Sequence, residues 1–92
     1  MADVELTDAE LVERWRAGDE DAATILHERY LARLLNLVGR HLAGKFNSRL
    51  DPDDVVQSVF RSIFRLTREG RFEFEDDGAF WKLLLTMALN KV

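Results

Sequence analysis

The sequence has no cysteine, a single proline and no long apolar run. Without cysteine the chain can form neither a disulfide nor a thiolate metal site. The N-terminal stretch MADVELTDAE is acidic and lacks the apolar segment of a signal peptide. No apolar run approaches the roughly 18 residues that a membrane-spanning helix needs. We therefore expect a soluble, cytoplasmic protein with no membrane partner.

The composition is that of one small globular domain covering residues 1–92. Apolar residues make up 47% of the chain and charged residues 33%, which is enough for a single core. The net charge of −4 argues against strong nonspecific binding to nucleic acid, because such binding depends on neutralisation of phosphates by Lys and Arg. The charge is uneven: residues 1–30 carry nine acidic and three basic side chains, whereas residues 31–50 carry four basic and no acidic ones.

The segment 50–66, LDPDDVVQSVFRSIFRL, predicts a helix with two different faces. Asp51 is a suitable N-cap and Pro52 suits the first helical position, where no amide hydrogen is needed. Apolar residues recur at spacings of three and four and form a stripe for the core, namely Val56, Val59, Phe60 and Ile63. A polar ridge repeats with the same spacing and consists of Asp54, Gln57, Ser58, Arg61 and Arg65.

The remaining chain predicts three further helices, and thus an all-α bundle of about four. A capping box at Thr7 begins a helix over about 8–17, a long apolar helix runs over about 19–43, and a last helix covers 79–92 with Asp77 as N-cap. Gly39 marks a close helix contact or is simply tolerated. Residues 67–77 are expected to form an ordered loop pinned by Phe74, although the alternating Phe72 and Phe74 also suit a short strand.

Three blocks of sequence resemble the small extracytoplasmic-function group of bacterial sigma factors. The run DPDDVVQSVFRSIFR is similar to the group's most characteristic helix, although Ser58 stands where a carboxylate is usual. The run LVERWRAGDEDAATILHERY is similar to the opening pattern, and Phe74, Phe80, Leu84, Ala88 and Asn90 match the closing one. Together the blocks cover nearly the whole chain in the right order.

This resemblance implies two binding surfaces. The helix with the polar ridge would dock on the clamp coiled coil in the beta-prime subunit of the RNA polymerase core, through Asp54, Gln57, Ser58 and Arg61. The last helix and the preceding loop would contact the minus-ten element of promoter DNA, through Asn90, Lys91, Lys82, Trp81 and Phe74. An anti-sigma factor is a further candidate partner.

Several of these assignments have a simpler alternative. Asp54 lies in the first helical turn and could serve only the helix dipole, whereas Gln57 has no capping role. Trp81 could stack on a base or be buried against a neighbour. The acidic residues of segment 73–77 would repel phosphates. A helical protein-interaction module without a role at promoters is the competing function.

The sequence does not suggest an enzyme or a cofactor. His27 and Glu28 begin an H-E-x-x-H string, but Leu31 stands where the second histidine would be needed. Neither histidine has the carboxylate of a di-iron motif, and no glycine-rich phosphate loop occurs. The chain stops within the last predicted helix, so we expect a fragment that lacks the separate domain for the minus-thirty-five element.

Overall fold

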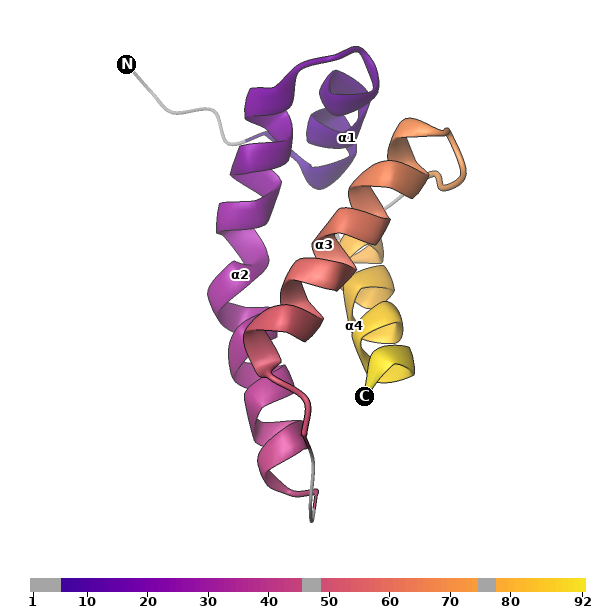
Figure 1. Cartoon of the computed structure of the whole chain (residues 1–92). Helices are drawn as coiled ribbons and strands as arrows, with labels where there is room; N and C mark the ends of the chain where they lie inside the picture. The colour runs from indigo at the N-terminus through magenta and orange to yellow at the C-terminus, as the bar shows by residue number, and fades with distance from the viewer. Residues whose placement is uncertain (1–5, 46–48, 75–77) are drawn as a thin grey trace, which may run out of the picture.

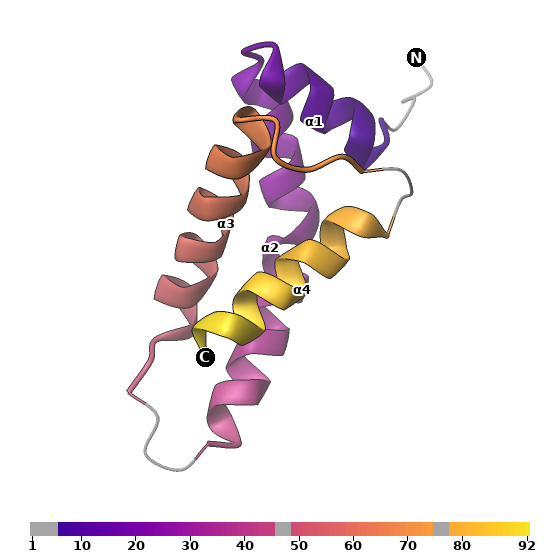
Figure 2. The same ribbon diagram turned by 90° about the vertical axis from the view of Figure 1, so that its right-hand side faces the viewer.

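The computed structural model of the chain describes residues 6–45, 49–74 and 78–92. In these residues the chain forms four helices and no strand, and the helices are α1 (Asp8–Arg16), α2 (Glu20–Ala43), α3 (Pro52–Arg68) and α4 (Ala79–Lys91). The long α2 is the spine against which α3 and α4 pack, and α1 lies across the end where α2 begins and α3 ends (Figures 1 and 2). The predicted all-α fold is confirmed.

The helix starts follow the capping signals of the sequence. The Thr7 hydroxyl accepts from the amide of Glu10, whose carboxylate in turn accepts from the amide of Thr7, so the capping box is present. Asp19 caps α2 and Asp51 caps α3, each through a carboxylate that accepts a backbone N–H. Local chemistry thus decides where three of the four helices begin.

The end of α3 differs from the prediction. We expected a loop from residue 67, but Thr67 and Arg68 belong to the helix. Thr67 is fully buried, and its hydroxyl donates to the carbonyl of Ile63 at 2.8 Å, so a polar residue continues the helix without an unpaired group. Gly70, with φ +75°, then closes a Schellman motif.

The segment before α4 is partly outside the described residues, and so is the expected N-cap Asp77. The N-cap position of α4 is occupied by Gly78, which provides no side-chain cap. Residues 71–74 form no strand, which favours the loop over the strand. The ring of Phe74 packs edge-on against Phe80 at a centroid distance of 5.4 Å. The predicted packing of Phe74 against the core is therefore confirmed, whereas residues 75–77 of the expected loop lie outside the described residues.

The core lies between α2, α3 and α4 and is closed at one end by α1. It contains the predicted stripe of α3 and one face of each other helix, namely Leu11, Val12, Ala22, Leu26, Leu34, Val38, Leu42, Val55, Val56, Val59, Phe60, Ile63, Phe80, Leu84 and Ala88. Gly39 lies outside any close contact, because a Cβ added there would meet no atom within 4 Å. Of the two explanations for this glycine, the structure supports simple tolerance.

Candidate functional site

The polar ridge of α3 lies on the surface of the molecule. Asp54, Gln57 and Arg61 are exposed and Ser58 is half-buried, while the opposite side of the helix enters the core. The ridge extends from residue 54 to 65, which corresponds to about 16 Å of helix at 1.5 Å per residue. Since its opposite face is packed into the core, α3 presents these groups in a fixed register.

Two of the ridge residues are available to a partner. In the described part of the chain, no side-chain hydrogen bond or ion pair engages Asp54 or Gln57. The cap of α3 is instead formed by Asp51, whose carboxylate accepts from the amide of Asp53 at 2.9 Å. Asp54, in the first turn of α3, interacts only with the helix dipole, and this interaction leaves its carboxylate oxygens free to accept hydrogen bonds.

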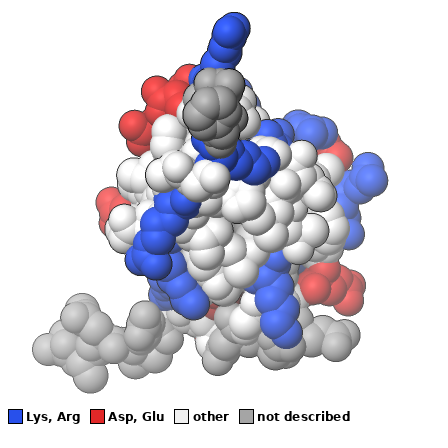
Figure 3. Space-filling view, turned by 90° about the horizontal axis from the view of Figure 1, so that it is seen from below, with Lys and Arg blue, Asp and Glu red and all other residues white. Residues whose placement is uncertain are grey.

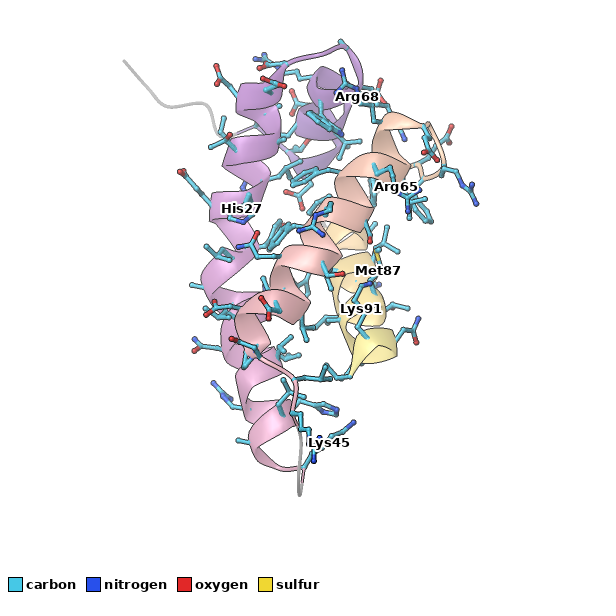
Figure 4. The ribbon with its side chains drawn as sticks, in the orientation of Figure 1. His27, Lys45, Arg65, Arg68, Met87 and Lys91 are labelled. Atoms are coloured by element: carbon cyan, nitrogen blue, oxygen red, sulfur yellow. The ribbon has the colours of Figure 1, made fainter. Side chains whose placement is uncertain are left out.

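A hollow joins the beginning of α3 to the end of α4. It has a volume of about 270 Å³ and is lined by Leu50, Asp54, Val55, Ser58 and Lys91. Figure 4 shows Lys91 on the side of α4 that faces α3. The hollow thus brings Lys91, assigned from the sequence to DNA binding, close to two residues assigned to the polymerase.

The other residues predicted to contact DNA are distributed over α4 and the segment before it. Lys82 and Asn90 are exposed, whereas Phe74 is half-buried by its contact with Phe80. Trp81 is also half-buried, because its ring stacks on Tyr30 of α2 at 5.7 Å between centroids. Asn90 and Lys91 therefore form one exposed group at the end of α4, and Trp81 belongs to a different surface next to α2.

Tyr30 connects Trp81 to a buried carboxylate in α1. Asp8 is only 3% exposed, accepts from Arg29 at 2.8 Å and also accepts from the Tyr30 hydroxyl. Burial and the hydrogen bond to Asp8 raise the pKa of Tyr30 above its ordinary value. Tyr30 therefore remains a neutral donor over the physiological range, and its ring is held in place for stacking on Trp81.

The residues of α1 that hold the end of α3 were not predicted from the sequence. The Arg16 guanidinium donates to the carbonyl of Thr67 at 2.8 Å and also to that of Phe72. The Trp15 indole donates to the carbonyl of Phe64 at 2.8 Å. These contacts fix the segment that leads toward α4. They join residues about fifty positions apart in the chain, so no local spacing signals them.

A basic surface beside Trp81 was also not predicted from the sequence. The Arg33 guanidinium lies over the Trp81 ring, 4.2 Å from its centroid. Arg33 and Arg40 are seven residues apart on α2 and line one hollow with Trp81. A signal was available in the absence of acidic residues from 31–50, but it did not indicate a partner on α4.

Neither a metal site nor a membrane-spanning helix is found in the described residues. Over 6–45, 49–74 and 78–92, no three His, Cys, Asp or Glu side chains are grouped so that they could hold a metal ion. No helix in these same ranges is both long and apolar enough to cross a membrane. The ring of His27 packs against the ring of Phe60, with 4.5 Å between the ring centroids. In the described residues the fold is thus a bundle of four helices with an exposed polar ridge on α3.

Comparison with known proteins specifies the class further. The sequence model of the family described as ECF sigma factor matches residues 5–92, and the chain belongs to this family. It is 35% identical over 86 residues to the ECF RNA polymerase sigma-E factor of Escherichia coli strain K12, covering 94% of this chain and 40% of that protein. The sigma-E factors of Haemophilus influenzae and Salmonella typhimurium strain 14028s are also 35% identical over 86 residues, which are 94% of this chain. The matched residues cover 41% of the Haemophilus influenzae protein and 40% of the Salmonella typhimurium protein.

The chain thus spans about 40% of the length of these relatives. No solved structure matches it. The resemblance noted from the three sequence blocks is confirmed at the level of the family.

Proposed function

We propose that this chain is the part of an ECF sigma factor that binds the RNA polymerase core and recognises the minus-ten promoter element, thereby directing transcription initiation. The observation that carries the proposal is the exposed ridge on α3 in a chain that belongs to this family. The domain performs no chemistry in this proposal; it supplies binding surfaces that the polymerase lacks.

Docking on the polymerase relies on the acceptor oxygens of the ridge. The carboxylate of Asp54 and the amide of Gln57 are exposed on a helix whose other face is packed. Both can accept hydrogen bonds from arginines of a coiled coil such as the clamp of the beta-prime subunit, and Gln57 can also donate. Little conformational freedom of the helix is lost on binding, because α3 is already ordered.

Binding of the chain to a purified clamp fragment, measured by calorimetry, tests this part of the proposal. Asp54→Ala combined with Gln57→Ala should weaken binding about 30-fold, since the loss of one charged and one neutral hydrogen bond costs about 2 kcal/mol. The control is Glu28→Ala with Asn36→Ala, which removes the same kinds of group from exposed positions of α2. Unchanged affinity of the α3 variant would favour the alternative, an interaction module without a role at promoters.

Promoter recognition is assigned to α4 and the segment before it. Asn90 is exposed at the end of α4, where its amide can both donate to and accept from the edge of an unpaired base. Lys82 and Lys91 are exposed cations for the phosphates, and the ring of Phe74 packs against Phe80 at the start of α4. Trp81 contributes an aromatic ring on the side of α4 that faces α2.

Binding of a single-stranded minus-ten oligonucleotide to the complex of this chain with polymerase core tests this second part. Asn90→Ala should weaken binding about tenfold, in keeping with the 1–3 kcal/mol of a specific base contact. Thr86→Ala is the control, because Thr86 is exposed on α4 and its hydroxyl bonds only the backbone of its own helix. Equal losses in both variants would contradict base recognition by Asn90.

The free chain should bind duplex DNA weakly, because its net charge is −4. Tight, salt-sensitive binding of the free chain to duplex DNA would contradict the proposed division of work with the polymerase.

A further inference from the structure

The hollow between the start of α3 and the end of α4, here called the α3–α4 hollow, has an apolar floor and a charged rim. Val55 is 6% exposed and belongs to the core, whereas Leu50, which precedes the cap of α3, is 47% exposed. The exposed charged residues of the lining are Asp54 of α3 and Lys91 of α4. Single exposed leucines are common on protein surfaces, but this one lies beside a buried valine in a concave site. Such a site can receive an apolar group from a partner.

The size of the α3–α4 hollow suits one side chain. Its volume is about 270 Å³, below the roughly 300–1,000 Å³ of sites for small-molecule ligands. Its wall on α3 is held in place, because Val55 and Val59 of the same helix are packed into the core. Ser58 is small and leaves the space open, whereas a longer side chain at this lining position would occupy part of it. The hollow therefore has the properties of a pocket for one anchoring residue of a protein partner.

Opposite charges on the two sides of the hollow define the neighbours that such an anchor needs. Asp54 provides a carboxylate on the α3 side, and Lys91 provides an ammonium group on the α4 side. Over the described ranges of the chain, neither side chain forms an ion pair or a side-chain hydrogen bond. A matching partner carries a basic residue toward α3 and an acidic residue toward α4. On a helix, residues three or four positions apart share one face, so a single helix can present a basic, an apolar and an acidic residue in this order.

The surroundings of the hollow fit a protein better than a nucleic acid. The lining contains no aromatic ring on which a base could stack, and its carboxylate would repel a phosphate. Seen from below, the end of the molecule where α4 ends and α3 begins is largely uncharged, with Lys and Arg side chains around it (Figure 3). Depletion of charge at the centre and polar groups at the rim are typical of protein interfaces.

We infer that the α3–α4 hollow is an anchor site for the RNA polymerase core. It holds one apolar side chain of a polymerase helix, while a basic residue of that helix pairs with Asp54 and an acidic residue pairs with Lys91. The inference rests on the proposed docking function and adds Leu50 and Lys91 to the docking surface. Because the two charges differ in sign, the hollow also fixes the direction in which the polymerase helix lies on the ridge.

Truncation of a leucine tests the apolar part of the site. The affinity of the chain for purified polymerase core is measured by fluorescence anisotropy in the absence of DNA. Leu50→Ala should weaken binding about tenfold, because it removes a packed contact from a desolvated pocket. The matched control is Leu89→Ala, since Leu89 is 51% exposed in the last turn of α4 and does not line the hollow. A loss of the same size in the control would reflect apolar surface in general and overturn the inference.

Filling the hollow distinguishes a pocket from a flat apolar patch. Ser58→Leu adds apolar surface but occupies the space of the anchor, so it should weaken binding to the core enzyme about tenfold or more. Leucine is a better helix former than serine, and circular dichroism should show that the helical content is retained. Stronger binding of this variant would show that the partner covers a flat patch, which would overturn the inference.

Neutralisation of Lys91 tests the charged part of the site. Lys91→Gln should weaken binding to the core enzyme about threefold at low salt, as expected for one exposed ion pair. The loss should decrease at high salt, because exposed charges are screened. The control is Lys45→Gln, which removes the same charge from an exposed position after α2. If both lysine variants bind equally weakly, net charge explains the result and the inference fails.

The outcomes separate this inference from the proposed function. Weaker binding of Gln57→Ala, with unchanged binding of Leu50→Ala, would retain docking by the ridge and refute the anchor site. Absence of any binding of the unmodified chain to the core enzyme would instead refute the proposed function itself. Self-association of the chain that Leu50→Ala abolishes, with unchanged affinity for the core enzyme, would identify a second copy of the chain as the occupant and refute the inference.

Discussion

Replacement of Gly39 by alanine tests the packing around α2. Gly39 lies in the interior of α2, and a Cβ added to it would meet no atom within 4 Å. The substitution therefore introduces no clash. It removes the entropic cost of a glycine in a helix and should stabilise the folded chain.

The expected gain in the free energy of unfolding is about 1 kcal/mol, the difference between Gly and Ala within a helix. For a domain of this size, such a change raises Tm by about 4–8 °C. Thermal and urea unfolding followed by far-ultraviolet circular dichroism would measure both quantities, because the described chain is mostly helical.

Gly70→Ala is the matched control, since a Cβ at that position also meets no atom within 4 Å. Gly70 differs in its backbone, with φ +75°, which costs a residue with a side chain about 1–2 kcal/mol. The two variants should therefore change stability in opposite directions. Destabilisation by Gly39→Ala would refute the reasoning and indicate that another helix or partner approaches this position closely.

Two further predictions concern the contacts of α1. Tyr30 is the single tyrosine of the chain, so the phenolate absorbance reports its titration alone. This absorbance should not appear near pH 10 in the folded protein but should appear there in urea. Asp8→Asn should lower the pKa of Tyr30 in the folded protein. Because folding raises the pKa of Tyr30, the contribution of Tyr30 to stability is full below pH 10 and is lost as the pH rises above 10. Titration of Tyr30 near pH 10 in the folded protein would contradict its burial. Arg16→Gln should lower the free energy of unfolding by about 1.5 kcal/mol and accelerate hydrogen exchange at the end of α3. Unchanged exchange there would show that the hydrogen bonds from Arg16 to the carbonyls of Thr67 and Phe72 do not hold the end of α3.

The helices could be read from the sequence because their signals are local. The capping box at Thr7 and the Asp51–Pro52 pair lie within a few residues of the helix starts that they determine. The prediction was wrong at the end of α3, where a threonine and an arginine read as loop residues. Thr67 is buried there and Arg16 binds its carbonyl, and neither contact can be derived from neighbouring residues.

The candidate binding surfaces were likewise predictable from the sequence only where their signals are local. The ridge of α3 follows from helical periodicity, so its exposure was predictable from the spacing of residues 54–65. Trp81 was left between stacking on DNA and burial, and the structure places it against Tyr30 and Arg33 of α2. The angle at which two helices pack decides which side chains meet, and this angle depends on the whole core.

The sequence by itself therefore determined the helical class, most of the helix boundaries, the core-facing stripes and the family. Caps and the period of 3.6 residues act over one or two turns, so their effects are written in adjacent letters. Only the tertiary structure decided that Lys91 and Asp54 line one hollow, that Arg16 holds the end of α3, and that arginines of α2 share a hollow with Trp81. These contacts join distant parts of the chain, and they exist only after the core has set the positions of the helices.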